Sequence, residues 1–215
     1  MRKYFDIELE RLNDLLLKMG VMVEELIDIS IDSLLKQDEV LADKVINLDI
    51  EIDKMEIKIE KKCIELIALQ QPKAKDLREI STILKIITDL ERIGDNGVNI
   101  AKITKRLSNE IYIKPLIDIP HMANISKEML RKSLDSFVKK DEELAREVAK
   151  MDDIVDDIYE TIYIELLDIL IEDKSKMKQI VDLLFIGRYI ERISDHTTNI
   201  CERIIYMISG NRVNY

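Results

Sequence analysis

The chain of 215 residues carries 33 Lys and Arg against 43 Asp and Glu, a net charge of −10, and 47% of its residues are hydrophobic. So acidic a protein has no electrostatic attraction to nucleic-acid phosphates or anionic lipids, which argues against direct nucleic-acid binding. It has only 5 Gly and 3 Pro and no Trp. This composition is typical of long amphipathic helices and excludes β-sandwiches, barrels and glycine-loop nucleotide folds.

Apolar residues recur every three or four positions along most of the chain, which is the period of an amphipathic helix. The pattern is interrupted at residues 37–38, where Asp38 can cap the following helix, at Pro72, and between Pro115 and Pro120. The spacing predicts helices over residues 6–36, 39–69, 76–108, 120–139, 141–172 and 174–209.

The second half of the chain repeats the first. Residues 32–53 align with 135–156 at an offset of 103, and residues 90–100 align with 190–200 at an offset of 100. The change in offset places three extra residues in the first half, within the turn at 70–75. The repeat predicts an all-α fold with two three-helix bundles in tandem, related by pseudo-symmetry and divided into residues 1–112 and 113–215.

The uncharged runs of the chain bear on its location. The longest, residues 119–126 and 204–211, fall far short of the roughly twenty apolar residues of a membrane-spanning helix. Three acidic residues among the first ten occupy the place where a signal peptide has its apolar stretch. Cys63 and Cys201 stand far apart without metal-ligand spacing, as expected of reduced thiols. We therefore expect a cytoplasmic protein.

Four acidic pairs with i, i+4 spacing occupy equivalent places in the two repeats. Both carboxylates of a pair lie on one face of a helix and repel each other. A bound cation would remove this repulsion, and such oxygen ligands suit Mg or Mn, or Fe or Zn when an imidazole joins them. The predicted ligands are Asp49, Asp53, Glu91 and Asp95 in the first half and Asp152, Asp156, Glu191 and Asp195 in the second, with Asn99, His196 and Asn199 as candidate additional ligands.

An alternative interpretation needs no metal. Among 43 acidic residues many i, i+4 pairs arise by accident, and Asp89, Arg92 and Asp95 have the spacing of an exposed ion-pair ladder. Asn99 and Asn199 can equally well form hydrogen bonds to a neighbouring helix. The recurrence of the pairs in both halves favours the cation sites.

Motifs that support catalysis are missing from the sequence. It contains no glycine-rich phosphate loop, no nucleophile elbow, and neither the H-E-x-x-H nor the E-x-x-H pattern of helical metalloenzymes. Two histidines offer few acid–base groups near neutral pH. We predict that the protein is not an enzyme, against the alternative of a metal-dependent hydrolase or metal-storage protein built on the same carboxylates.

Two segments carry a family resemblance. QPKAKDLREI at residues 71–80 leads into DLERIGD at 89–95, and the second half has ERISDHTTNI at 191–200. Together they closely resemble the PhoU family of phosphate-signalling regulators, and the resemblance covers nearly the whole chain. Ser194 stands where the family usually has Gly, and Cys201 where Ala is common.

The resemblance implies two three-helix bundles in a protein that is usually dimeric and restrains phosphate-scarcity genes and phosphate uptake. The implied partners are the ATPase subunit of the phosphate ABC transporter and the phosphate sensor histidine kinase. Family members bind metals through a D/E-x-x-x-D motif, which the four acidic pairs match. The alternatives are a helical metal-binding structural adaptor and a transport accessory protein without kinase coupling.

Overall fold

The computed structural model describes residues 2–70 and 72–215; Met1 lies outside it, as does Gln71 in the turn predicted to hold the extra residues. The described residues form helices and no strand, which confirms the all-α prediction. In chain order the elements are α1 (Arg2–Lys36), α2 (Glu39–Gln70), α3 (Ala74–Leu107), α4 (Asp118–Lys139), α5 (Glu142–Ala149), α6 (Asp152–Glu172), the 3-10 helix η1 (Lys174–Lys176) and α7 (Met177–Ser209).

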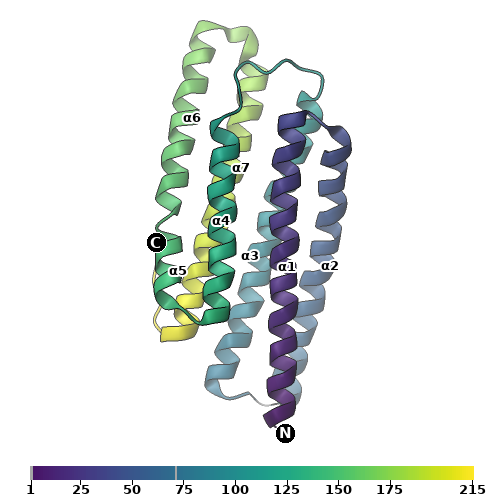
Figure 1. Cartoon of the computed structure of the whole chain (residues 1–215), viewed down its shortest axis with the longest axis vertical. Helices are drawn as coiled ribbons and strands as arrows, with labels where there is room; N and C mark the ends of the chain where they lie inside the picture. Colours follow the sequence, from purple (N-terminus) through teal and green to yellow (C-terminus); the bar gives the residue numbers. More distant parts are fainter. Residues whose placement is uncertain (1, 71) are drawn as a thin grey trace.

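The helices form two bundles with nearly parallel long axes (Figure 1). Helices α1 to α3 make the first bundle, and α4 to α7 make the second, in which α5 and α6 follow one another along the place of a single long helix. Residues 108–117 connect the bundles at the end opposite the N-terminus. The tandem repeat is thus confirmed, while the division at residues 112 and 113 stays a prediction.

Helices α3 and α7 hold the two halves together. They pack against each other at the centre of the molecule, and α1 also contacts α4. The chain runs in opposite directions along α3 and α7 (Figure 1), so the start of each lies beside the end of the other. We call this α3–α7 contact the seam.

The turns after α1 and α4 confirm the repeat at the level of single residues. Gln37 and Lys140, which are 103 positions apart, both have φ of 53°, a left-handed conformation that reverses the chain. Each is followed by an aspartate that caps the next helix. Asp38 accepts hydrogen bonds of 2.8 and 3.1 Å from the first turn of α2, as predicted, and Asp141 accepts one of 3.0 Å from the first turn of α5.

The prediction of one continuous helix over residues 141–172 is wrong. The helix is interrupted at Lys150 and Met151, between α5 and α6. The Met151 N–H donates to the Val148 carbonyl at 3.0 Å, and the Ile154 N–H donates to the Met151 carbonyl at 3.1 Å. These i to i+3 bonds tighten the chain locally into a 3-10 turn. No Gly or Pro marks the place, so the sequence carried no break signal.

Other helix ends differ from the prediction by a few residues. The first helix begins at Arg2 instead of residue 6, and the fourth begins at Asp118 instead of residue 120. The predicted final helix opens with η1 and becomes α-helical at Met177. No helix within the described ranges is long and apolar enough to cross a membrane.

The apolar stripes of the helices meet in a continuous core. Leu90 on α3 and Ile190 on α7, which are equivalent in the repeat, are both fully buried. Cys63 and Cys201 are free and buried, and burial raises the pKa of each thiol to about 12. Thiols that stay protonated at neutral pH are unreactive and serve as small core residues.

Candidate cation sites in the two halves

Each half brings its two acidic pairs together. In the first half α2 packs against α3, and the carboxylates of Asp53 and Asp95 act electrostatically on Asp49 from these two helices. In the second half α6 packs against α7, and Asp195 acts on Asp152 in the same way. The four pairs therefore form two clusters, one per half, which we call the first and second acidic sites.

The first acidic site is built around a close approach of α2 to α3. A Cβ atom added to Gly94 on α3 would lie 2.8 Å from Oδ1 of Asp49, so a larger residue there would make this carboxylate shift. Oδ1 of Asp49 is buried and has no hydrogen-bond partner among the described residues. A buried carboxylate oxygen without a partner is costly, and a cation would satisfy it.

Repulsion within the first site opposes full ionisation. Burial raises the pKa of Asp49 to about 6, and the negative charges of Asp53 and Asp95 add to the effect, while Lys102 opposes it. Burial also raises the pKa of Glu91, again with help from the charge of Asp95. A divalent cation placed among these carboxylates would reverse the effect, because it favours their charged forms.

The second acidic site has the equivalent carboxylates of the repeat in different surroundings. Asp152 is the first residue of α6, and its Oδ1 is buried without a hydrogen-bond partner in the described part of the chain. Burial raises the pKa of Asp152, whereas the nearby hydroxyl of Ser194 lowers it; the charges of Asp195 and Asp156 raise it further. The largest shift falls on Glu191, whose pKa is raised to about 7 by burial and then by the charge of Asp195.

Arginines neutralise part of each site. Arg92 lies 3.1 Å from Oδ2 of Asp95 and 3.3 Å from Oε2 of Glu91. In the second half, Arg188 forms an ion pair with Glu191. The ion-pair ladder considered above is thus realised in part. Arg188 was missed in the sequence, although its i, i+3 spacing to Glu191 on α7 is a signal for such a pair.

The three candidate additional ligands lie in two kinds of surroundings. Asn99 and Asn199 are half-buried one turn beyond the acidic pairs of α3 and α7. His196 points to the other half, where its Nδ1 lies 3.1 Å from Oδ1 of Asp89 across the seam. Asp89 therefore pairs with His196 and not with Arg92, as the ion-pair ladder of Asp89, Arg92 and Asp95 would require. A ligand role for His196 and the two asparagines stays a prediction.

The donor atoms of both sites suit a hard cation. The unpartnered oxygens of Asp49 and Asp152 and the mutual repulsion of the carboxylates are what a bound divalent cation would relieve. In their present positions, however, no three His, Cys, Asp or Glu side chains of the described ranges are grouped so that they could hold a metal ion. Binding would require the carboxylates to turn toward a common point. Metal binding therefore fits the residues and stays a prediction.

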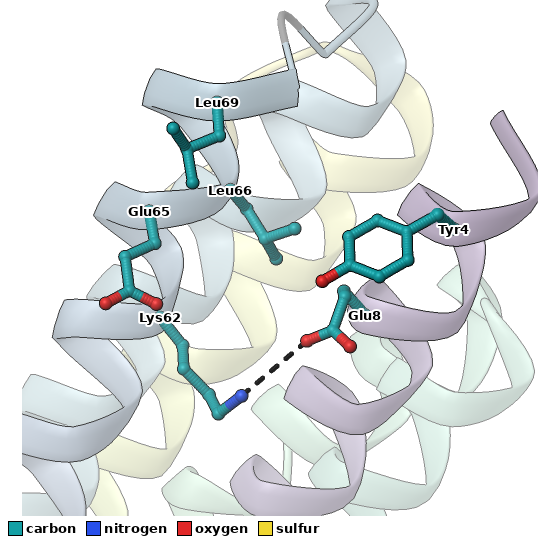
Figure 2. A pocket seen from close by; sticks show the side chains of 6 residues that line it. All are labelled: Tyr4, Glu8, Lys62, Glu65, Leu66 and Leu69. Carbon is teal, nitrogen blue, oxygen red and sulfur yellow. Dashed lines mark ion pairs between the residues drawn. The ribbon is translucent and has the colours of Figure 1, made fainter. Parts of the chain in front are cut away.

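A separate pocket of about 90 Å³ opens between the start of α1 and the end of α2 (Figure 2). Nζ of Lys62 lies 3.7 Å from Oε2 of Glu8 across it, and Leu66 and Leu69 form its apolar part. Tyr4 and Glu65 complete the lining. The lining contains no His, Cys or Ser, so it offers no nucleophile paired with a base.

Comparison with known proteins identifies the family. The PhoU domain model matches residues 16–104 and 119–204, one match in each half. The chain belongs to the PhoU family. A phosphate-specific transport system accessory protein PhoU homolog of Clostridium acetobutylicum is 48% identical over 213 residues, covering 99% of this chain and 97% of the relative. One from Aquifex aeolicus is 42% identical over 208 residues, covering 97% and 94%.

Solved PhoU structures have the same fold. The crystal structure of PhoU from Pseudomonas aeruginosa matches with a TM-score of 0.92 at 35% identity, covering 96% of this chain and 100% of that one. The phosphate transport system regulatory protein PhoU from Streptococcus pneumoniae matches with a TM-score of 0.91 at 30% identity, covering 98% and 100%. The tandem arrangement of two bundles is thus shared over the full length of these PhoU chains.

Proposed function

We propose that this PhoU-family protein is an accessory protein of phosphate-specific transport that works by binding other proteins and not by catalysis. The observation that carries the proposal is the 48% identity, along 99% of the chain, to a relative named as such an accessory protein. The missing catalytic motifs and the pocket without a nucleophile–base pair support a role in binding.

In finer terms, the protein is a cytoplasmic homodimer that represses phosphate-starvation genes and limits phosphate uptake when phosphate is plentiful. It does so by contacting the ATPase subunit of the phosphate ABC transporter and the phosphate sensor histidine kinase. The length of the two bundles supports this role, because each presents long helical faces to a partner. It reaches the membrane only through these partners.

Cations at the acidic sites are the second part of the proposal. A bound divalent cation would supply positive charge between α2 and α3 in the first half and between α6 and α7 in the second. Asp49 and Asp152 would hold it through their unpartnered oxygens, and the carboxylates of the opposite helix would complete its ligands. The cation would thus tie neighbouring helices together and stiffen the surfaces offered to partners.

Co-purification tests the partners. The tagged full-length protein is incubated with the purified transporter ATPase subunit and, separately, with the cytoplasmic part of the sensor kinase. We expect both to be retained and the protein to elute as a dimer in size-exclusion chromatography with light scattering. Retention of neither partner contradicts the bridging role, and a monomer contradicts the assembly.

Amide substitutions test the sites. The variant E91Q/D95N/E191Q/D195N keeps the side-chain shapes and removes four charges, and we expect it to lose bound metal and to derepress a phosphate-starvation reporter. The matched control E10Q/D14N/E143Q/E147Q changes exposed acidic pairs of the same spacing outside both sites. Unchanged metal content in the first variant refutes the site assignment. Repression that survives complete metal loss refutes the regulatory role of the cation.

A transport accessory role without kinase coupling is the second candidate. The names of the Clostridium acetobutylicum and Aquifex aeolicus relatives mention phosphate transport and no kinase, which favours it. It predicts retention of the ATPase subunit alone in the co-purification. A purely structural adaptor would instead purify without metal and show no change in stability with a chelator.

A further inference from the structure

The antiparallel seam gives the molecule two equivalent ends. At one end Arg106, in the last turns of α3, forms an ion pair with Asp182 near the start of α7. Asp182 is only 5% exposed, so this carboxylate fills the seam between the two helices. The 100-residue offset of the repeat makes Tyr206 the counterpart of Arg106 and Thr82 the counterpart of Asp182.

At the other end this ion pair is missing and a cavity takes its place. Thr82 and Tyr206, the two counterparts, both line a cavity of about 190 Å³ between the start of α3, the end of α7 and the C-terminal residues 212–214. We call it the seam cavity. Where Asp182 brings a buried carboxylate to the first end, Thr82 brings only a hydroxyl to the second.

The seam cavity is strongly basic for so acidic a chain. Lys85, Arg203 and Arg212 line it, and Arg212 lies over the ring of Tyr206 at 5.9 Å from its centroid. None of the three cations forms an ion pair with the residues that the structure describes. The charge lining the cavity is +2, from three cations and the single acid Glu202 (3 − 1), whereas the whole chain has −10.

The neighbouring groups leave this positive charge available. Oε1 of Glu202 accepts the backbone N–H of Tyr215 at 2.9 Å, so this carboxylate also serves to hold the C-terminal residues. Arg78, one turn before Thr82 on α3, lies outside the lining of the cavity, and its guanidinium Nε is buried without a hydrogen-bond partner among the described residues. Its Nη1 lies 2.8 Å from where a Cβ on Gly210 would be, next to the segment that closes the cavity.

We propose that the seam cavity binds a small oxyanion, either free phosphate or a single phosphoryl group. Guanidinium groups match the geometry of such an oxyanion with paired N–H donors, and the hydroxyls of Ser81 and Thr82 add neutral donors. Drug-sized ligands occupy about 300–1,000 Å³, so a cavity of about 190 Å³ suits an ion or one group of a larger molecule. The ligand takes the role that Asp182 has at the opposite end.

Such a ligand would join parts of the chain that are distant in sequence. It would contact α3 of the first half, α7 of the second half and the C-terminal residues 212–214 together. Its occupancy would therefore fasten the two halves at the end of the seam that has no ion pair. This inference does not rest on the regulatory role proposed above, because binding is measured on the isolated protein.

Equilibrium binding of inorganic phosphate to the purified full-length protein, followed by calorimetry at physiological ionic strength, tests the proposal. We expect saturable binding that weakens with added salt. The variant R203Q/R212Q should weaken binding at least about tenfold, which corresponds to about 1.4 kcal/mol, because it removes two donors of charge-assisted hydrogen bonds. The control K58Q/K61Q also removes two positive charges, from exposed sites on α2, and should bind within about twofold of wild type.

ADP serves as a second probe, to separate the two sources of the oxyanion. Phosphate binding as tight as ADP binding indicates the free ion, and tighter ADP binding indicates a phosphoryl group of a larger molecule.

If neither probe binds saturably, or if R203Q/R212Q binds like wild type, the proposal is overturned. Equal losses in R203Q/R212Q and K58Q/K61Q overturn it too, since they would reflect net charge alone. If circular dichroism shows R203Q/R212Q to be misfolded, Lys85→Gln against Lys58→Gln decides in the same way.

Discussion

The two acidic sites carry the same kinds of carboxylates, yet they differ in what surrounds them. In the first site Asp49 lies within the long helix α2 and faces Gly94. In the second, Asp152 opens α6 directly after the interruption of the helix and lies near the hydroxyl of Ser194. The duplication has preserved the charged groups more strictly than the backbone and small residues that hold them.

This difference decides which carboxyl group is hardest to ionise. Among the described residues no hydroxyl lowers the pKa of Asp49, which rises to about 6. The hydroxyls of Ser194 and Thr198 lower the pKa of Asp152, and in the second site the large shift, to about 7, falls on Glu191 instead. Similar sequence motifs thus predict two sites of unequal cation affinity and unequal pH response.

The largest expected effect tests whether the cores of the halves are equivalent. Leu90→Ala and Ile190→Ala each remove a fully buried side chain at matching positions, and each should lower the free energy of unfolding by about 2–5 kcal/mol. Urea denaturation measures both. Val21→Ala, at a position that is 64% exposed, is the control and should change it by less than about 0.5 kcal/mol. A negligible cost for one of the two core variants would show that the halves are not equivalent.

Cation binding should separate the two sites. Mn²⁺ at a hundredfold excess over the Kd of one site should raise the free energy of unfolding by about 2.7 kcal/mol through that site, because it binds only the folded state. At one fixed Mn²⁺ concentration, E91Q/D95N should remove the contribution of the first site and E191Q/D195N that of the second, and the two losses should differ because the affinities differ. Denaturation with Mn²⁺ and with a chelator gives the comparison. A gain that persists when all four carboxylates are changed would place the cation elsewhere.

Ser194→Gly makes the second site resemble the first. Glycine inside a helix costs about 0.5–1 kcal/mol, and the loss of the hydroxyl should raise the pKa of Asp152 further. Urea denaturation measures the first effect, and NMR titration of Asp152 measures the second. An unchanged pKa of Asp152 would mean that Ser194 does not cause the difference between the sites.

The last comparison concerns the pH dependence of stability. In the folded protein the pKa of Asp49 is raised from 3.8 to about 6 and that of Glu191 from 4.5 to about 7. Between these values the folded state binds more protons than the unfolded chain, so each group makes the protein less stable as pH rises through its window. Asp49→Asn should remove the decline between about pH 4 and 6, and Glu191→Gln that between about pH 4.5 and 7.

Urea midpoints measured from pH 4 to 8 in a chelator follow this dependence without interference from metals. The exposed change Asp14→Asn is the control, and should leave the profile parallel to that of wild type. Profiles of Asp49→Asn and Glu191→Gln that also run parallel to wild type would contradict the raised pKa values.

Local sequence patterns predicted the fold and the residues that make up the acidic sites. The three-to-four period and the prolines placed most helix ends within a few residues, and the repeat identified equivalent carboxylates. The interruption at Lys150 and Met151 could not be predicted, because neither residue disfavours a helix and only packing in the folded chain tightens it. The contact of His196 with Asp89 joins residues 107 positions apart, which no local pattern connects. The seam cavity was missed for the same reason.

The central position of α7 has a consequence for synthesis of the protein. Helix α3 ends at Leu107, and its partner across the seam is complete only at Ser209, 102 residues later. Ribosomes add roughly 5–20 residues per second, so the side of α3 that α7 covers stays open for on the order of 5–20 s. A nascent chain at this stage holds a first bundle with an uncovered face. We expect chains that stop before α7 to aggregate, because the helix that closes the molecule is the last one made.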